Sequence, residues 1–393
     1  MDKTLSITMC AMFLFISNFI KTQAKDCNIA SYGGNPNGDI TDALAKAWTD
    51  ACTATEPSKV IVGPGTYTMN AMDIKGPCTA PSIELQVDGV IQAPANPASL
   101  KGADQWVRIG YVNGFTLSGT GTFDGQGPAA WKANDCAKNP KCNWPTMNFG
   151  FNFLNNSYIR GVTSKDSKNF HVNVLSCNNI NFDGFNISAP GDSPNTDGIH
   201  IGRSNGVTVA NTNIATGDDC VSLGDGNSNI TVVNVTCGPG HGISVGSLGR
   251  YDNEAPVSNV NVKNCTISNT MNGVRIKTWP GTPGAITVTD MHFEDIIMNN
   301  VQNPVIIDQE YCPSNQCDKS SPSKIKISNV SFTNIQGTSQ TQDGVVLICS
   351  SGVPCENVQL NNINLAFNGA EVTAKCLNVK PTVTGTAPTC AAA

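Results

Sequence analysis

The sequence predicts an all-β solenoid, a coil of short stacked strands closed at its N-terminal end by a short helix. The first observation behind this prediction is a repeat of apolar triplets whose middle residue is polar in most cases. One turn of such a coil cannot bury its apolar side alone, so stacked turns must share one core of Ile and Val. The triplets begin at Ile180, Val207, Ile230, Val260, Ile286, Ile325 and Val358.

The second observation is that polar residues precede apolar strands at a fixed interval. Asp197, Asp219 and His241 are 22 residues apart, and each stands directly before a strand that opens with Gly or Cys. If each interval is one turn, these side chains form a column with about 4.8 Å between turns. An antiparallel sandwich would also have many short strands, but it would not place like residues at like positions in successive repeats. The pattern predicts an inward ladder of Ile199, Val221, Ile243 and Val274.

The N-terminal region contains two further elements. Residues 1–24 have a basic Lys3, an apolar stretch and a small residue at Ala24, which is typical of a secretory signal peptide. A helix is expected from Thr41, as its cap, to Ala51, where it would plug the open end of the coil. Since no later stretch has the roughly 20 apolar residues of a membrane span, residues 25–393 are expected to form one soluble extracellular domain.

The cysteines fit an oxidising compartment. Of 16 cysteines, Cys10 lies in the signal peptide, so at least one of the other fifteen stays unpaired. Metal binding by a close pair is the competing interpretation, but no histidine lies near such a pair. Connectivity cannot be deduced from the sequence. Plausible local bridges join Cys220 to Cys237, Cys349 to Cys355, Cys312 to Cys317, and Cys376 to Cys390. Six glycosylation sequons, some of which could instead form buried asparagine ladders, begin at Asn155, Asn186, Asn229, Asn234, Asn264 and Asn329.

The charge pattern excludes one class of partner and favours another. A net charge of −6, with only 14% charged residues, argues against nucleic-acid binding. Four cations, Arg203, Arg250, Arg275 and Lys277, are expected around the polar column. Because Val274 and Ile276 take the inward positions of their strand, Arg275 and Lys277 must share its outer face. Cations beside carboxylates indicate a negatively charged ligand held next to an acid/base centre, although a solvated ion-pair network would look the same.

Four motifs on this repeat resemble glycoside hydrolase family 28, the polygalacturonases, and most closely the plant pollen-type branch. They are Ser193 to His200 (SPNTDGIH), Thr216 to Cys220 (TGDDC), Cys237 to Ser244 (CGPGHGIS) and Gly273 to Thr278 (GVRIKT). The resemblance covers essentially the whole mature chain. It implies a right-handed parallel β-helix, a pectin chain as partner, secretion to the cell wall, a monomer, and no cofactor or metal.

The resemblance also implies roles for individual residues. Asp218 would be the general acid, Asp197 and Asp219 would position and deprotonate the attacking water, and His241 would tune the protonation of the acid. Arg275 and Lys277 would bind the substrate carboxylate, with Asn195 and Tyr311 as further substrate contacts. Clustered carboxylates cannot all ionise cheaply, so a retained proton is physically reasonable. Asp197 alone could instead be a turn aspartate that binds backbone amides. The remaining histidines, His171, His200 and His292, are assigned to the surface or to the rungs.

Several functions fit this set of residues. The leading hypothesis is hydrolysis of α-1,4-linked polygalacturonate with inversion, acting from the chain end; internal (endo) cleavage is the alternative mode. A pectate lyase would also use a parallel β-helix, but it typically needs calcium. A non-catalytic pectin-binding wall protein would keep the cations but would not need Asp218.

Overall fold

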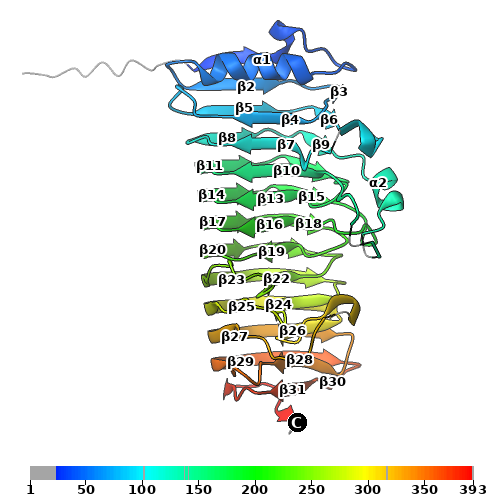
Figure 1. Cartoon of the computed structure of the whole chain (residues 1–393), viewed down its shortest axis with the longest axis vertical. Helices are drawn as coiled ribbons and strands as arrows, with labels where there is room; N and C mark the ends of the chain where they lie inside the picture. The colour runs from blue at the N-terminus through cyan, green and yellow to red at the C-terminus, as the bar shows by residue number, and fades with distance from the viewer. Residues whose placement is uncertain (1–23, 101, 137, 140, 316, 392–393) are drawn as a thin grey trace, which may run out of the picture.

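The computed structural model describes residues 24–391 except 101, 137, 140 and 316, so the predicted signal peptide lies almost wholly outside the described residues. The chain winds into a long parallel β-helix whose strands stack along the vertical axis of Figure 1, with α1 (Thr41–Cys52) across its N-terminal end. This confirms the solenoid and the capping helix. Within the described residues no helix is long and apolar enough to cross a bilayer.

Two sheets make up the coil. The 12-stranded sheet, which carries the polar column, is parallel throughout and has one strand from each turn. Its strands are β4 (Met72–Lys75), β7 (Gln105–Gly110), β10 (Met147–Asn152), β13 (Val172–Leu175), β16 (Ile199–Gly202), β19 (Val221–Leu223), β22 (Ile243–Leu248), β24 (Asn272–Thr278), β26 (Asn303–Asp308), β28 (Asp343–Ile348), β31 (Thr373–Leu377) and β33 (Cys390–Ala391).

The 21-stranded sheet bends around the rest of the coil, and in β23, β25, β27 and β29 its two strands per turn merge into single strands of 12 to 15 residues. Its strands are β1 (Lys25–Asn28), β2 (Ser58–Val62), β3 (Thr66–Thr68), β5 (Ile83–Val87), β6 (Val90–Gln92), β8 (Phe115–Ser118), β9 (Thr122–Asp124), β11 (Asn155–Arg160), β12 (Thr163–Lys165), β14 (Asn178–Asp183), β15 (Asn186–Ser188), β17 (Asn205–Ala210), β18 (Asn213–Ala215), β20 (Ser228–Val233), β21 (Thr236–Cys237), β23 (Val257–Ser268), β25 (Thr287–Val301), β27 (Lys326–Ser339), β29 (Glu356–Phe367), β30 (Ala370–Glu371) and β32 (Thr382–Thr384). The short helices are η1 (Ile29–Tyr32), η2 (Pro97–Leu100), α2 (Pro128–Ala133) and η3 (Pro313–Asn315).

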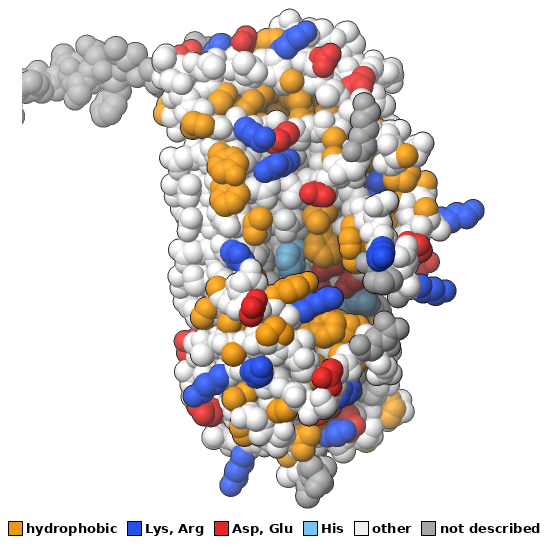
Figure 2. Space-filling model, viewed as in Figure 1, with side chains coloured by type: hydrophobic (Ala, Val, Ile, Leu, Met, Phe, Trp, Pro, Cys, Tyr) orange, Lys and Arg blue, Asp and Glu red, His pale blue; other side chains and the backbone are white. Residues whose placement is uncertain are grey.

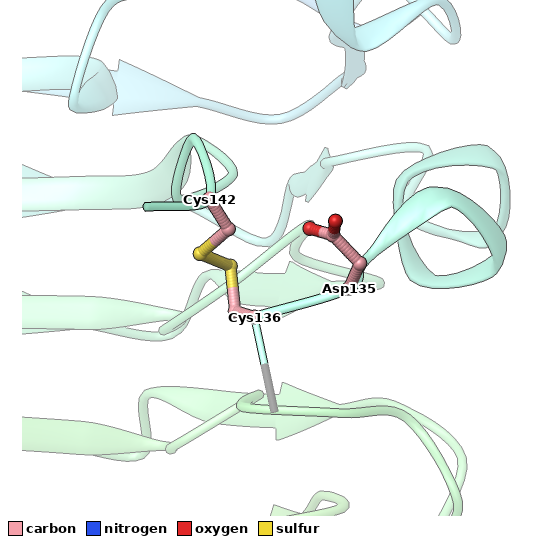
Figure 3. Close-up of side chains that lie close together, drawn as sticks. All are labelled: Asp135, Cys136 and Cys142. Carbon is pink, nitrogen blue, oxygen red and sulfur yellow. A yellow bond between two sulfur atoms is a disulfide. The ribbon is translucent and has the colours of Figure 1, made fainter. Parts of the chain in front are cut away.

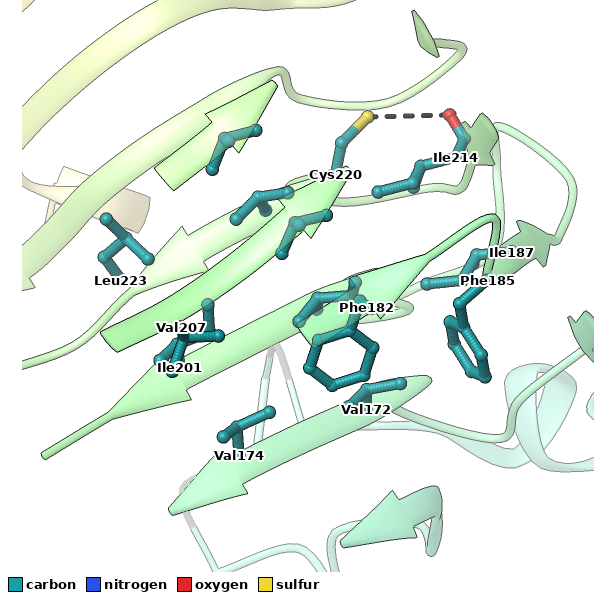
Figure 4. Packing of buried hydrophobic residues seen from close by; sticks show 14 of the residues in the cluster. Val172, Val174, Phe182, Phe185, Ile187, Ile201, Val207, Ile214, Cys220 and Leu223 are labelled. Carbon is teal, nitrogen blue, oxygen red and sulfur yellow. Dashed lines mark hydrogen bonds between the residues drawn. The ribbon is translucent and has the colours of Figure 1, made fainter. Parts of the chain in front are cut away.

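The predicted inward ladder is confirmed. Ile199 pairs with Val221, Val221 with Ile243, and Ile243 with Val274, and all four side chains are buried. Figure 4 shows the same packing in neighbouring turns, where Val172, Ile201 and Leu223 point into the core together with Phe182 of β14 and Phe185, which follows β14. The burial of these β-branched and aromatic rows is the main source of stability that a coil of this kind has.

The register of the triplet repeat was predicted only in part. Ile180, Val207, Ile230 and Val260 do stack in one row, but the row continues through Met291 and Val330 before it reaches Val358. Ile286 and Ile325 lie five residues earlier in their turns. The prediction was wrong there because Ile286 and Ile325 begin an apolar triplet directly before β25 and β27, and each of these long strands contains another triplet that fits the periodicity equally well.

The N-terminal cap of α1 also differs from the prediction. Thr41 is the first helical residue, and Ile40, in the cap position, makes no side-chain capping bond. Asp39 provides the side-chain cap instead: its Oδ1 accepts a hydrogen bond from the Thr41 backbone N–H at 2.8 Å.

All four predicted disulfides are present, and two more join Cys52 to Cys78 and Cys136 to Cys142. The free cysteines among the described residues, Cys27, Cys177 and Cys265, are all buried. Asp135 lies beside Cys136 and Cys142 in a group that could suggest a metal site (Figure 3). Because both sulfurs belong to one disulfide, they offer no thiolate to a metal.

Asparagines at the corners of the coil form ladders, but on the exterior. Asn234 Nδ2 donates to Asn211 Oδ1 at 3.1 Å, and Asn264 Nδ2 donates to Asn234 Oδ1 at 2.6 Å, at exposed positions. The expectation of buried ladders was therefore wrong for these sequons. The corners have φ near +55°, a left-handed conformation that Asn tolerates better than most residues.

Candidate active site

The segments that precede β16, β19 and β22 place three carboxylates and a histidine on adjacent turns. Asp197 ends the first segment, Asp218 and Asp219 end the second, and His241 ends the third. Backbone hydrogen bonds keep the segments in register: Gly198 N–H donates to Asp219 O at 2.9 Å, and His241 N–H donates to Asp218 O at 2.7 Å. The face viewed in Figure 2 is hollowed where histidine, acidic and cationic surfaces meet.

Gly242 allows the turns to approach this closely. Its φ is +84°, and a Cβ at this position would lie 2.1 Å from the backbone oxygen of Asn272 on the next turn. Any other residue would therefore push β22 away from β24 and shift His241 relative to Asp218.

Asp218 and His241 form the partly exposed half of the cluster. Asp218 Oδ1 lies 3.0 Å from His241 Nδ1, with 23% of the Asp218 side chain and 30% of the His241 side chain exposed. The same oxygen accepts a hydrogen bond from the Asp219 backbone N–H at 2.8 Å. This carboxyl group is thus open to a ligand and oriented by a side chain that can carry a proton.

Asp219 is buried and surrounded by donors. Its Oδ1 accepts from Ser244 Oγ at 2.9 Å and from Arg275 Nη2 at 2.9 Å, and its Oδ2 accepts from Lys277 Nζ at 2.7 Å. Burial alone would raise the pKa of Asp219, but the charges of Lys277 and Arg275 outweigh that effect and hold the pKa below its ordinary value. Asp219 is therefore a fixed carboxylate.

Asp197 has the opposite environment. Its Oδ2 accepts from Ser222 Oγ at 3.0 Å, which is the hydrogen bond that the structure gives its carboxyl group, so the turn-aspartate interpretation does not describe it. Burial raises the pKa of Asp197 well above its ordinary value, and the charges of Asp218 and Asp219 raise it further. Of the two buried carboxyl groups, Asp197 therefore binds a proton more readily than Asp219.

The predicted substrate contacts lie on both sides of the carboxylates. Lys277 Nζ and the Arg275 guanidinium lie 5.3 Å and 5.9 Å from the centre of the Tyr311 ring. Asn195 lies two residues before Asp197, and its Oδ1 accepts from Asn134 Nδ2 at 3.4 Å. The structure therefore brings seven of the eight residues that the sequence singled out close together: Asp197, Asp218, Asp219, His241, Arg275, Lys277 and Tyr311. The side-chain contact given for Asn195 is to Asn134, outside this group.

Two of the four cations expected around the column do not reach its carboxylates. Arg203 forms an ion pair with Asp225 at 3.1 Å, and Arg250 lies over the Trp279 ring at 5.1 Å. His200, which was assigned to a rung, does reach the site. Its Nδ1 lies 2.8 Å from Ser222 Oγ, the hydroxyl group that binds Asp197. The predicted register already pairs His200 with Ser222, but sequence reasoning missed the contact because it depends on the orientations of the two side chains.

The same cluster contains a set of atoms that could hold a metal ion: Asp218, Asp219 and His241 each offer one within 4.8 Å of the others. The donor chemistry does not favour a cation, however, because Arg275 and Lys277 already neutralise Asp219. The arrangement suits an anionic ligand next to a group that can donate a proton.

A profile of the family described as "Glycosyl hydrolases family 28" matches residues 52–390. The chain belongs to glycosyl hydrolases family 28. A polygalacturonase from Medicago sativa is 60% identical over 391 residues, which cover 98% of this family 28 chain and 93% of the relative. An exopolygalacturonase from Platanus acerifolia is 52% identical over 360 residues, covering 91% and 95% of the two chains.

Solved structures share the fold at low sequence identity. The endo-xylogalacturonan hydrolase of Aspergillus tubingensis superposes on this family 28 chain with a TM-score of 0.80, at 23% identity, over 92% of this chain and 99% of the other. A hyperthermoactive exopolygalacturonase from Thermotoga maritima gives a TM-score of 0.76 at 17% identity, over 92% and 91%. These likenesses support the right-handed parallel β-helix.

Proposed function

We propose that the protein is a secreted polygalacturonase that hydrolyses the α-1,4 bonds of demethylated pectin. The observation that carries this proposal is the pairing of a partly exposed carboxyl group, Asp218, with two cations bound to the buried Asp219. Arg275 and Lys277 can bind a uronate carboxylate by charge-assisted hydrogen bonds. Asp218 can then protonate the leaving oxygen while water, held by Asp197 and Asp219, attacks the anomeric carbon. Secretion is supported by the disulfides and by the predicted signal peptide.

The alternatives lack this support. A lyase would need a calcium site and a base, but the buried carboxylate Asp219 is occupied by cationic side chains. A non-catalytic binding protein would need the cations, but it would have no use for an exposed carboxyl group oriented by His241.

The direct test is Asp218→Asn. We expect turnover of polygalacturonate to fall by at least about 10²-fold, because general acid catalysis is worth on the order of 10²–10⁴, while binding to the polymer persists. Reducing-sugar assays and binding to immobilised polygalacturonate measure the two quantities. A variant that keeps more than about a tenth of wild-type turnover would remove Asp218 from this role.

We further propose that the enzyme acts from the chain end. Two features support this mode: the 52% identical relative is named an exopolygalacturonase, and the segment between α2 and β10 is anchored beside the site. Asn134 binds Asn195 at 3.4 Å, and Asn169 Nδ2 donates to Pro145 O at 3.0 Å. Chain-end action requires one side of the groove to be closed so that a single sugar fits beyond the carboxylates, and we infer that this segment provides that closure.

Chromatography of early digestion products tests the mode of action. Chain-end action releases monogalacturonate first, while the polymer shortens slowly. Oligomers of mixed length in the first minutes would show internal cleavage and would leave the hydrolase proposal intact.

A further inference from the structure

Two of the site's carboxyl groups each accept a hydrogen bond from a serine on the following turn. Ser222 Oγ donates to Asp197 Oδ2 at 3.0 Å, and Ser244 Oγ donates to Asp219 Oδ1 at 2.9 Å. Ser222 and Ser244 are register partners in β19 and β22, and both are buried. The two Asp–Ser pairs are therefore structural repeats of one another, 22 residues apart.

The residue that orients each serine differs between the repeats. Ser244 Oγ accepts from Arg275 Nε at 3.1 Å, whereas Ser222 Oγ lies 2.8 Å from His200 Nδ1. A guanidinium group can only donate, so it leaves the Ser244 hydroxyl hydrogen free for Asp219 and supports only a carboxylate. A neutral imidazole nitrogen donates in one tautomer and accepts in the other. His200 Nδ1 can therefore either donate a hydrogen bond to Ser222 Oγ or accept one from it.

The surroundings of His200 keep the ring neutral and in place. Burial and the nearby charge of Lys277 lower its pKa to about 4, against the smaller opposite influence of Asp219 and Asp225. The Phe170 ring packs against it with a centroid separation of 5.4 Å. The charged groups that face Asp197 itself are Asp218, Asp219 and Lys277.

We propose that His200 and Ser222 are a positioning pair that keeps Asp197 hydrogen-bonded in both of its protonation states, so that Asp197, and not Asp219, takes the proton of the attacking water. When Asp197 is ionised, His200 Nδ1–H donates to Ser222, and Ser222 O–H donates to Asp197. When Asp197 is protonated, it donates to Ser222, which donates to the Nδ1 of the other histidine tautomer. Asp219 has three donors and a side chain that is only 2% exposed, so it has no equivalent second state.

The inference rests on the proposed hydrolysis. When Asp197 gains its proton, His200 releases the Nδ1 proton and takes one up at Nε2 through solvent, so the ring stays neutral and the pair gains only the water proton. The water oxygen bonds to the anomeric carbon as the glycosidic bond breaks, the water proton passes to Asp197, and the Asp218 proton passes to the leaving oxygen. Asp197 then returns its proton to solvent or to Asp218, which restores the resting enzyme.

The test compares Ser222→Ala and His200→Leu with their conservative counterparts Ser222→Thr and His200→Asn. The disruptive variants should lower kcat at least tenfold with KM within twofold of wild type, and the double variant should be no worse than the worse single one. The acid limb of the kcat/KM profile should move to higher pH in Ser222→Ala, because Asp197 loses the donor that favours its ionised form. The conservative variants should restore most of kcat.

The chain supplies a matched control. His292 Nδ1 lies 2.8 Å from Ser331 Oγ, the same contact between adjacent strands of the 21-stranded sheet. His292→Leu and Ser331→Ala should leave kcat and the pH profile unchanged. The proposal is overturned if Ser222→Ala and His200→Leu keep kcat within twofold with an unmoved acid limb, or if the conservative variants lose as much as the disruptive ones. A wild-type enzyme that does not hydrolyse polygalacturonate would instead overturn the proposed function.

Discussion

At the scale of single residues, two aspartates on adjacent turns differ because of what lies next to them. Asp219 and Asp197 are both buried, yet the pKa of one is lowered and that of the other is raised. The cause is the position of Lys277 and Arg275, which bind Asp219 directly and leave Asp197 facing two like charges.

This difference predicts that Asp197 is a source of instability. Its native pKa lies above its unfolded value. The free energy of unfolding therefore falls as the pH rises from the unfolded pKa to the native pKa, because the buried group is then ionised. We expect Asp197→Asn to be inactive but more stable than wild type at pH 7, by about 0.5–2 kcal/mol. Denaturant unfolding at several pH values measures this difference.

The gain should shrink as the pH falls toward about 4, where wild-type Asp197 holds its proton and resembles asparagine. Equal or lower stability of Asp197→Asn at pH 7 would show that the buried carboxyl group is better compensated than its neighbours indicate.

At the scale of elements, the corners of the coil make a separate contribution. Asn259 has φ +54°, and its Nδ2 donates to Asn229 Oδ1 at 2.6 Å on the previous turn. It therefore combines a tolerated left-handed conformation with a contact between turns.

We expect Asn259→Ala to lower the free energy of unfolding by about 1–2 kcal/mol, since alanine resists the left-handed region. Asn259→Gly should lose less, because glycine adopts this conformation freely. Asn261→Ala, at a neighbouring position without positive φ, is the control. If Asn259→Ala and Asn261→Ala lose the same amount, the hydrogen bonds matter and the corner conformation does not.

The sequence predicted those features that depend on spacing alone. The 22-residue interval fixes the register of Ile199, Val221 and Ile243 and of the column of Asp197, Asp219 and His241. Val274 follows after a longer interval and was placed by the apolar pattern of its strand. The two additional disulfides do not follow, because they depend on loop paths. His200 and Ser222 share the predicted register, but their contact also depends on side-chain orientations, which spacing does not determine. The cap at Asp39 was missed because Asp39 and Thr41 are both good capping residues and the sequence does not rank them.

At the scale of the whole molecule, the coil places residues that are one turn apart in the sequence next to each other in space, and these residues form the candidate site. Adjacent turns bring Asp218, the proposed general acid, to the same face as Asp197 and Asp219. An enzyme with this arrangement can protonate the leaving oxygen on one side of the sugar ring and deprotonate the attacking water on the other, which is what inversion requires. The central claim is therefore a single displacement by water.

Proton NMR of the anomeric signal in the first minutes of polygalacturonate digestion tests this claim most directly. Direct displacement of an α-linked sugar by water predicts that the first-formed galacturonate is the β-anomer, which then equilibrates, with no added calcium required. An initial α-anomer would show a covalent glycosyl-enzyme route, and a product with a new double bond would show elimination; either result would contradict the account.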